Sequence, residues 1–315
     1  MNRRLRVARK NKYIPHLAEF YFEPDLDWTP EECGKLYEAN GKDYYNTIIY
    51  SDCIKGMARM PANSVDLVVA DPPFGIGFTG KESIYNRKAE NVEEGYLEVE
   101  NSYGVFSERW ICRLPRIMKP EASAYIISGW TNIGDILNAI KKAKLKIINH
   151  IIWKYQFGVF TKRKFVTSHY HILFVVKNPK KYFFNRIEHY NEDVWHIPRK
   201  YMPKQKKNGT KLPVKLIEKM IDFSSKPGDL VFDPFMGNGT TAVAAKANWR
   251  HFFGFEINEK MKPIIEHALN QVSLGQHYIP YNERLKSPEE LARINKDYEK
   301  AYREYLKREK LEVLT

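Results

Sequence analysis

Cysteine is scarce in this sequence. Cys33, Cys53 and Cys112 are the only cysteines among 315 residues, and their spacing matches no metal-ligand pattern. An odd number of scattered cysteines excludes the disulfide framework of a small secreted domain and argues against a zinc site. We therefore expect reduced thiols, no metal and a location in the cytoplasm.

Long hydrophobic runs are absent as well. Residues 1–6 are basic, but no apolar run follows them, and no later stretch approaches the length of a membrane span. A transmembrane helix needs about 20 mostly apolar residues, and a signal peptide needs an apolar core. The sequence thus predicts neither a membrane segment nor a secretion signal.

Acidic residues are outnumbered by basic ones. The chain has 51 lysines and arginines against 38 aspartates and glutamates, which gives a formal net charge of +13. A surplus of this size favours a polyanionic partner such as nucleic acid, because bound phosphates release their counterions. A basic surface without such a partner is the open alternative.

Apolar segments alternate with helical patterns along the middle of the chain. Strand-like segments occupy residues 46–50, 64–70, 124–129, 147–153, 170–177, 230–232 and 251–256. Helical patterns occupy residues 54–60, 106–118, 133–144, 214–224 and 242–247. This alternation predicts an α/β fold with a mostly parallel sheet. We expect an extension with short helices from about Pro30, then one domain, then a charged helical tail, over residues 1–44, 45–275 and 276–315.

Polar residues recur at the ends of the predicted strands. They are Asp52, Asp71, Ser128, Asp233 and Glu256. In open α/β sheets, ligands bind beyond the carboxyl ends of the strands. We therefore expect the functional site at this edge of the sheet.

The first candidate motif is Asp71-Pro72-Pro73-Phe74, directly after the apolar segment 64–70. Proline fixes φ and has no backbone N–H, so the carbonyl groups of this segment face outward as acceptors. A carboxylate, these carbonyls and an aromatic ring form a rigid platform that suits a planar amino group. The alternatives are a strand-end cap for Asp71 and a core position for Phe74.

The second motif runs from Asp233 to Thr241, between a predicted strand and a predicted helix. Gly237 and Gly239 permit close backbone approaches, and a helix N-terminus offers free N–H groups. Glu256 ends the next strand, where an acid can accept both hydroxyls of a ribose. No lysine precedes the two threonines, so the Walker phosphate loop is a poor match, and Asp233 would repel phosphate. An adenosine cofactor with a positive centre, such as S-adenosylmethionine, fits better.

Taken together, these motifs resemble those of DNA amino methyltransferases. Asp71-Pro72-Pro73-Phe74 resembles their catalytic motif, residues 233–241 their cofactor loop, and Gly254-Phe255-Glu256 their ribose-binding acid. The catalytic motif comes before the cofactor loop, which is the order of the circularly permuted β group. The resemblance spans residues 46–271. It implies a Rossmann-like methyltransferase fold, S-adenosylmethionine as the cofactor and double-stranded DNA as the partner.

The resemblance also implies roles for individual residues. Asp71 and Pro72 would accept the amino hydrogens of a flipped base on the platform that Pro73 completes, and Phe74 would stack on the base. The residues implied in cofactor binding are Asp52, Lys211, Asp233, Phe235, Gly237, Gly239, Thr240 and Glu256. Lys211 stands where the family has His followed by Lys-Pro. This chain lacks that His and has an extra Leu, which weakens the assignment of Lys211.

Target recognition in this group usually lies between the catalytic and cofactor motifs, here over residues 155–207. Clustered basic residues would bind DNA phosphates there, and a solvated charged face is the alternative for each of them. The candidates are Arg163, Arg186, Arg199 and Lys204. Because the insert is short, the loop 76–104 or a second subunit of a homodimer is a candidate to share recognition. The same resemblance suggests a cognate restriction endonuclease and association with the nucleoid.

The target base is the least determined feature. Asp71 at the head of its motif is typical of adenine N6 enzymes, whereas residues 75–80 and 85–87 resemble archaeal enzymes of CTAG sites that modify cytosine N4. The balance slightly favours cytosine N4, with adenine N6 as the alternative. Two further alternatives are an RNA methyltransferase and a catalytically silent DNA-binding protein with the same fold.

Overall fold

The computed structural model describes residues 25–73, 102–156, 158, 162–163, 165–187, 191–199, 211–284, 303 and 307. The chain divides into two compact units. The larger comprises Cys33–Phe184 and Asp193–Tyr278, and the smaller comprises Met1–Glu32, Asn185–Glu192 and Ile279–Thr315. The predicted division into an extension, a catalytic domain and a tail stays a prediction. Most of the expected tail helix lies outside the described residues.

An eight-stranded sheet forms the centre of the larger unit. Its strands are β1 (Thr47–Tyr50), β2 (Val65–Ala70), β3 (Met118–Ser128), β4 (Lys146–Lys154), β5 (His169–Val176), β6 (Val194–His196), β7 (Leu230–Asp233) and β8 (His251–Glu256). They lie in the order β1-β8-β7-β2-β3-β5-β4-β6, and β5 runs antiparallel to both of its neighbours while the other pairs are parallel. The expected α/β fold with a mostly parallel sheet is confirmed.

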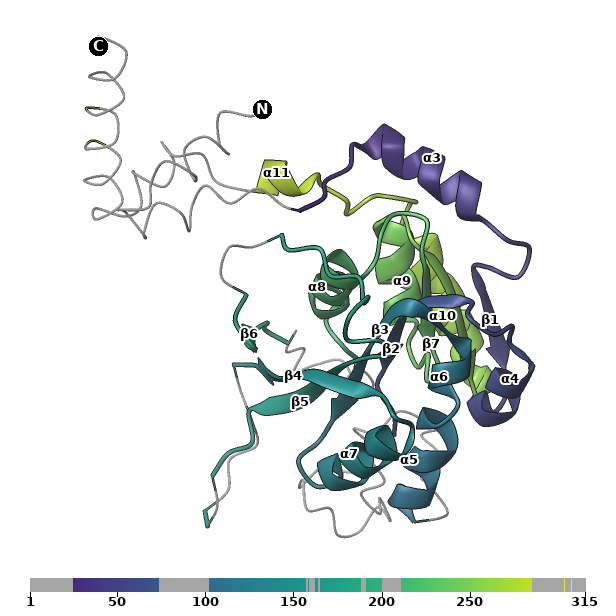
Figure 1. Ribbon diagram of the computed structural model, residues 1–315, viewed down its shortest axis with the longest axis vertical. Helices are drawn as coiled ribbons and strands as arrows, with labels where there is room; N and C mark the ends of the chain where they lie inside the picture. The colour runs from purple at the N-terminus through teal and green to yellow at the C-terminus, as the bar shows by residue number, and fades with distance from the viewer. Residues whose placement is uncertain are drawn as a thin grey trace. The chain divides into compact units, whose positions relative to one another are not determined.

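Helices cover both faces of this sheet (Figure 1). One face carries α4 (Cys53–Arg59), α5 (Tyr103–Ile111), α6 (Leu114–Ile117) and α7 (Ile133–Lys142), and the other carries α8 (Val214–Ser224), α9 (Thr240–Ala247) and α10 (Lys262–Asn270). Along β2, Val68 and Ala70 pack toward the first group of helices, and Leu67 and Val69 pack toward the second. This central strand is therefore apolar on both sides, as parallel strands covered on two faces usually are.

The structure corrects the helix predicted over residues 106–118. Two helices, α5 and α6, replace it, because Pro115 cannot continue a helix but is tolerated in the first turn of α6. Helix α3 (Pro30–Asn40) confirms the helix expected from about Pro30. Sequence patterns missed α10 and the shorter elements β6, η2 (Glu259–Met261) and α11 (Tyr281–Arg284).

The smaller unit joins segments that lie far apart in the sequence. The amide of Asn185 accepts a hydrogen bond from the backbone N–H of Leu26 (2.9 Å) and donates one to its carbonyl (3.0 Å). The carboxylate of Asp27 accepts hydrogen bonds from the backbone N–H groups of Tyr281 (2.8 Å) and Asn282 (3.1 Å). Residues 25–32 and 279–284 thus belong to this unit together with a piece of the predicted insert.

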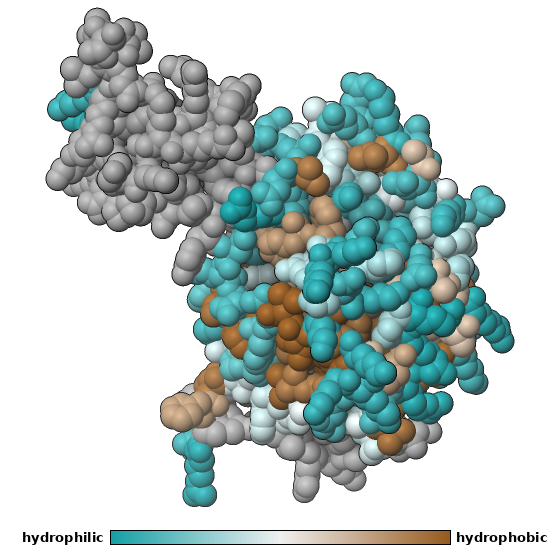
Figure 2. All heavy atoms as spheres, in the orientation of Figure 1, coloured by the Kyte–Doolittle hydropathy of each residue, from teal (hydrophilic) through white to brown (hydrophobic). Residues whose placement is uncertain are grey.

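Hydrophilic side chains cover most of the visible face of the larger unit, with a hydrophobic area among them (Figure 2). None of the helices that the structure describes has the length and apolar character needed to span a lipid bilayer.

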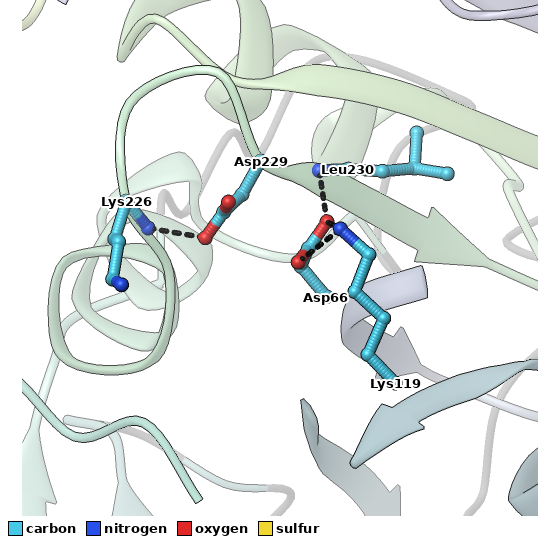
Figure 3. Close-up of polar contacts among 5 residues, drawn as sticks. All are labelled: Asp66, Lys119, Lys226, Asp229 and Leu230. Atoms are coloured by element: carbon cyan, nitrogen blue, oxygen red, sulfur yellow. Dashed lines mark hydrogen bonds and ion pairs between the residues drawn. The ribbon is translucent and has the colours of Figure 1, made fainter. Parts of the chain in front are cut away.

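Two aspartates lie together where β2 and β7 begin (Figure 3). Asp66 binds Nζ of Lys119 at 2.7 and 2.8 Å and accepts a hydrogen bond from the backbone N–H of Leu230 at 3.0 Å. Asp229 accepts a hydrogen bond from the backbone N–H of Lys226 at 2.6 Å. Burial and the neighbouring charge of Asp66 raise the pKa of Asp229 above its usual range. Burial and the nearby Asp66 therefore favour a proton on Asp229 in the folded state.

Replacement of these two carboxylates is expected to have opposite effects on stability. A raised carboxyl pKa means that the folded state binds the proton more tightly than the unfolded state does. The stability that this proton contributes is lost as the pH rises through the folded-state pKa. At pH 8, Asp229→Asn should leave the free energy of unfolding unchanged or raise it, because it removes an unfavourable charge. Asp66→Asn should lower it by about 1–3 kcal/mol, because Lys119 loses its partner. Urea unfolding of both variants at pH 5 and pH 8 measures these changes. If Asp229→Asn lowered the free energy of unfolding more at pH 8 than at pH 5, that result would contradict this account.

Candidate active site

The two motifs meet at the carboxyl edge of the sheet. β2 and β7 are parallel neighbours, with Leu67 opposite Val231 and Val68 opposite Phe232. The chain continues from β2 to β3 on one side and from β7 to β8 on the other. Such a reversal of strand order opens a crevice beyond the strand ends, where ligands bind in open α/β sheets. Asp71 and Asp233 stand at this position.

Asp71 is set up as an acceptor without a partner. Its Oδ1 atom is buried and has no hydrogen-bond partner among the described residues. The pKa of Asp71 is raised to about 7, chiefly by burial and further by the negative charge of Asp233, while the positive charge of Arg199 lowers it. Pro72 is buried and Pro73 is half-buried. An unpaired buried carboxyl oxygen costs free energy, which a bound hydrogen-bond donor would recover.

The carboxylate of Asp233 accepts hydrogen bonds from two other residues of the second motif. Its Oδ1 accepts a hydrogen bond from the backbone N–H of Phe235 (2.8 Å), and its Oδ2 accepts one from Oγ1 of Thr241 (2.6 Å). Burial raises the pKa of Asp233 to about 7. In this structure both oxygens thus shape the loop, and the predicted attraction of Asp233 for a cationic cofactor stays a prediction.

Glycines let the loop pass close to its neighbours. Gly237 and Gly239 have φ angles of +52° and +75°, a region that favours glycine. A Cβ atom on Gly239 would also lie 2.8 Å from Cγ2 of Ile265 in α10. Gly254 in β8 is equally constrained, because a Cβ there would lie 2.4 Å from the carbonyl oxygen of Asp233. The glycines therefore let the turn Gly237–Gly239, which we call the cradle, pack closely against α10 and β8 at the start of α9, where Thr240 is buried.

Glu256 is held in a fixed orientation beside this cradle. Its Oε2 accepts a hydrogen bond from the backbone N–H of Gly237 (2.7 Å), and its Oε1 accepts one from the backbone N–H of Asn258 (2.8 Å). Because each carboxylate oxygen can accept more than one hydrogen bond, this geometry is compatible with the two hydroxyls of a ribose. The side chain is 8% exposed, so its charge acts in a poorly solvated place.

Asn238 is a site residue that sequence reasoning missed. It lies between Gly237 and Gly239, and its Oδ1 is buried without a hydrogen-bond partner in the described part of the chain. A buried amide oxygen of this kind calls for a polar ligand. The cradle, Glu256 and Asn238 together fit S-adenosylmethionine, whose ribose and amino acid groups supply hydroxyl and ammonium donors.

Other predicted cofactor residues have visible structural roles. Oδ1 of Asp52 caps α4 by accepting hydrogen bonds from the backbone N–H groups of Ile54 (2.6 Å) and Lys55 (3.0 Å). The ring of Phe235 packs against two rings of α5, with centroids 5.8 Å from Phe106 and 5.1 Å from Trp110. Lys211 is exposed shortly before α8. Their contacts with the cofactor stay predictions.

The predicted DNA-binding residues have different surroundings. Arg163 is exposed in the connection between β4 and β5. Arg186 belongs to the smaller unit, where it pairs with Asp25 at 3.3 Å. Arg199 is only 9% exposed and lies among aromatic rings. Lys204 lies outside the described residues, as does Phe74 of the catalytic motif.

The described residues contain no group of three or more His, Cys, Asp or Glu side chains that could hold a metal ion.

Comparisons with known proteins agree with this arrangement. Residues 65–267 match the N6/N4 DNA methylase family. The chain is 31% identical to the type II methyltransferase M.HinfI of Haemophilus influenzae over 257 residues, which cover 75% of this chain and 72% of that protein. It is 31% identical to the DNA adenine methyltransferase YhdJ of Escherichia coli K12 over 280 residues, which cover 79% and 87%.

A solved structure, the complex of M1.HpyAVI with S-adenosylmethionine, matches with a TM-score of 0.55 at 23% identity and covers 71% of this chain and 98% of that one. At this identity the match supports the fold, while the family match covers more than half of the chain. The chain therefore belongs to the N6/N4 DNA methylase family and is an S-adenosylmethionine-dependent DNA amino-methyltransferase.

Proposed function

We propose that the protein methylates an exocyclic amino group of a base flipped out of duplex DNA, and that Asp71 and the Pro72 carbonyl accept the two amino hydrogens. The observation that carries this proposal is the buried Oδ1 of Asp71, which has no hydrogen-bond partner among the described residues and lies beside the cofactor loop. A base inside the duplex cannot present its amino group to such a site, so flipping is required, at a few kcal/mol of unstacking.

The residues of the platform would make the amine nucleophilic. The lone pair of an exocyclic amine is delocalised into the ring, which makes the nitrogen a poor nucleophile. Hydrogen bonds to Asp71 and to the Pro72 carbonyl would favour a tetrahedral nitrogen and stabilise the positive charge that develops on it. S-adenosylmethionine supplies the electrophilic methyl group, and the cradle at Gly237–Gly239 aligns it. Phe74 would stack on the base.

Two bases are candidates for the target. The name of YhdJ, 31% identical over 79% of this chain, favours adenine N6, as does the leading Asp71. The segment after Gly75, with its resemblance to enzymes of CTAG sites, favours cytosine N4. The similarity to YhdJ covers far more of the chain than the segment after Gly75 does. We therefore place adenine first and cytosine second.

Nucleoside analysis separates the two. Duplex DNA of mixed sequence, incubated with the protein and S-adenosylmethionine and then digested, should yield N6-methyladenine in mass spectrometry. N4-methylcytosine alone would reverse the order of the candidates. Methylation of structured RNA in preference to duplex DNA would contradict the proposal.

The connection between β4 and β5 is the proposed contact with the DNA backbone. β5 runs antiparallel to β3, and His171 lies opposite Ser128, so this connection extends from the edge of the sheet that carries Asp71 (Figure 1). Lys162 and Arg163 are exposed in it, and Phe165 is 98% exposed. Positive side chains on the catalytic side of the sheet suit a phosphate backbone.

Loss of one charge in this connection should weaken DNA binding independently of sequence. For Arg163→Ala we expect the salt dependence of log Kd for duplex DNA to fall by about one unit of slope, because one phosphate contact is lost. Arg59→Ala is the matched control, since Arg59 ends α4 and is exposed away from the carboxyl edge. Equal slopes for wild type and Arg163→Ala in fluorescence anisotropy would remove Arg163 from the DNA contact.

A homodimer and a cognate restriction endonuclease also belong to the proposal, as does a place in the nucleoid. These proposals are supported by the family to which the chain belongs and by its similarity to M.HinfI, which is named a type II methyltransferase. Sedimentation of the free protein and of its DNA complex tests the first.

A further inference from the structure

The side chain of Phe165 lies almost entirely in solvent. It is 98% exposed, whereas Trp130, the next most exposed large apolar side chain that the structure describes, is 58% exposed. Its neighbour Val166 is 40% exposed, and Lys162 and Arg163 shortly before it are exposed as well. Single exposed apolar residues are common on soluble proteins. A phenyl ring beside two positive charges, however, suits a partner that offers both anionic groups and flat apolar surfaces, as nucleic acid does.

The two sides of the connection between β4 and β5 stay close together beyond the strands. The backbone N–H of Tyr155 donates a hydrogen bond to the carbonyl of Ser168 at 3.0 Å, and Nζ of Lys154 donates one to Oγ of Ser168 at 2.8 Å. Further out, a Cβ atom on Gly158 would clash with the carbonyl oxygen of Thr167, so the two sides approach closely. The connection therefore leaves the sheet as a hairpin.

Aromatic packing fixes the root of this hairpin. The ring centroids of Trp153, Tyr155 and Tyr170 lie 5.6–5.7 Å apart, and the guanidinium carbon of Arg199 lies 5.3–5.8 Å from all three. The side-chain amide of Gln156 accepts a hydrogen bond from the backbone N–H of Arg199 at 2.9 Å and donates one to its carbonyl at 2.6 Å. Because these contacts hold the root in place, residues beyond it lose less conformational freedom on binding a partner.

The register of the sheet places this hairpin near the level of the catalytic motif. In β3, the partner of Ala70 lies two residues before the partner of His171. Asp71 directly follows Ala70, so its backbone lies close to the level of His171. Phe165 precedes His171 by six residues, which span at most about 20 Å when extended. β5 is two strands from β2, which corresponds to about 10 Å or about three base-pair steps. Because the major groove is about 8.5 Å deep, a hairpin of this reach can bring Phe165 to the base stack.

We propose that Phe165 is a positioning residue that inserts into the base stack of duplex DNA close to the target and stabilises the state in which the target base is flipped out. This inference rests on the proposed function. Apolar side chains inserted at a base step partly unstack and kink the duplex. An aromatic ring can replace the stacking that a flipped base gives up.

The charge of the hairpin favours DNA over a second copy of the chain as the partner. Lys162 and Arg163 would bind phosphates on the DNA backbone beside the inserted ring. The chain carries a formal net charge of +13, so a second copy would bring mostly like charges toward these two residues.

The test compares methyl transfer to paired and mismatched duplexes under single-turnover conditions. Each duplex is built around a site that the wild-type protein methylates, and the mismatch is placed at the target base, where it lowers the cost of flipping. For Phe165→Ala we expect a loss of about 10–100-fold on the paired duplex, which is the size of one lost stacking contact. On the mismatched duplex the loss should be less than about threefold. Phe165→Trp should stay near wild type on both duplexes, because an indole ring also stacks.

Two controls separate this role from a structural or a purely electrostatic one. Ile147 is 41% exposed near the start of β4, at the end of the strand opposite the hairpin, and Ile147→Ala should transfer as wild type does on both duplexes. Phe165→Ala should leave urea unfolding and the salt dependence of log Kd for DNA unchanged, because the ring is exposed and uncharged.

Equal losses on the two duplexes, or transfer by Phe165→Ala within about threefold of wild type on the paired duplex, would overturn the inference. So would a Phe165→Ala protein that sediments as a smaller species than wild type, because the ring would then contact a second copy of the chain. In each of these cases the wild type still methylates DNA, so the proposed function stands. A wild-type protein that methylates no duplex DNA would contradict the proposed function itself, and the inference with it.

Discussion

Asp71→Ala is expected to lower kcat for methyl transfer by about 10²–10³-fold while leaving S-adenosylmethionine bound. Removal of one fixed acceptor from a charge-stabilising site typically has an effect of this size. The cofactor cradle does not depend on this side chain, because its loop is closed by Asp233, Thr241 and Glu256. Single-turnover transfer of a labelled methyl group to duplex DNA measures the loss, and calorimetry measures cofactor binding.

Two further variants sharpen this result. Asp71→Asn keeps the shape of the side chain and one acceptor oxygen but removes the negative charge, so it should fall between wild type and Asp71→Ala. Asp193→Asn, an exposed aspartate beside β6, is the matched control and should retain wild-type rates. Transfer by Asp71→Ala within threefold of wild type would remove Asp71 from the mechanism.

Glu256→Gln is expected to weaken S-adenosylmethionine binding by about 10–100-fold. The carboxylate holds the backbone N–H of Gly237 and that of Asn258, and a hydrogen bond to a charged group is worth about 1.5–3 kcal/mol. A neutral amide keeps one acceptor but places an NH₂ group where an acceptor is needed. Calorimetric titration with the cofactor measures the change.

Glu259 provides the control for this variant. It lies three residues on, is exposed, and begins η2. Glu259→Gln should bind the cofactor as wild type does. If Glu256→Gln bound S-adenosylmethionine with unchanged affinity, the ribose would have to contact another group. The assignment of the cofactor to the cradle at Gly237–Gly239 would then be contradicted.

The site residues that sequence reasoning predicted at strand ends share one physical cause. Asp71, Asp233 and Glu256 each follow an apolar segment short enough to be a buried strand, and parallel strands place their carboxyl ends at one edge. Such residues can be located from one-dimensional patterns. The helix predicted over 106–118 fails for a local reason, because the pattern of apolar residues continues through Pro115 although the backbone cannot.

Other features depend on contacts that a sequence does not contain. The aromatic rings around Arg199 come from β4, from the residue just after it and from β5, and no spacing in the chain indicates that they meet Arg199. Asn238 attracts attention only because its Oδ1 is buried with no partner among the residues that the structure describes, which is a property of the folded loop. Sequence alone could not show that Asp52 caps α4 or that Arg199 is enclosed.

The most direct test of the central claim, that Asp71 presents the amine of a flipped DNA base to S-adenosylmethionine, is methyl transfer to a defined duplex. The wild-type protein and Asp71→Ala would be incubated with cofactor carrying a labelled methyl group, and the digested nucleosides would be analysed. We predict label on an exocyclic amino nitrogen of a DNA base with wild type and a loss of about 10²–10³-fold with Asp71→Ala. Label on a ring carbon, or equal label with both proteins, would contradict the account.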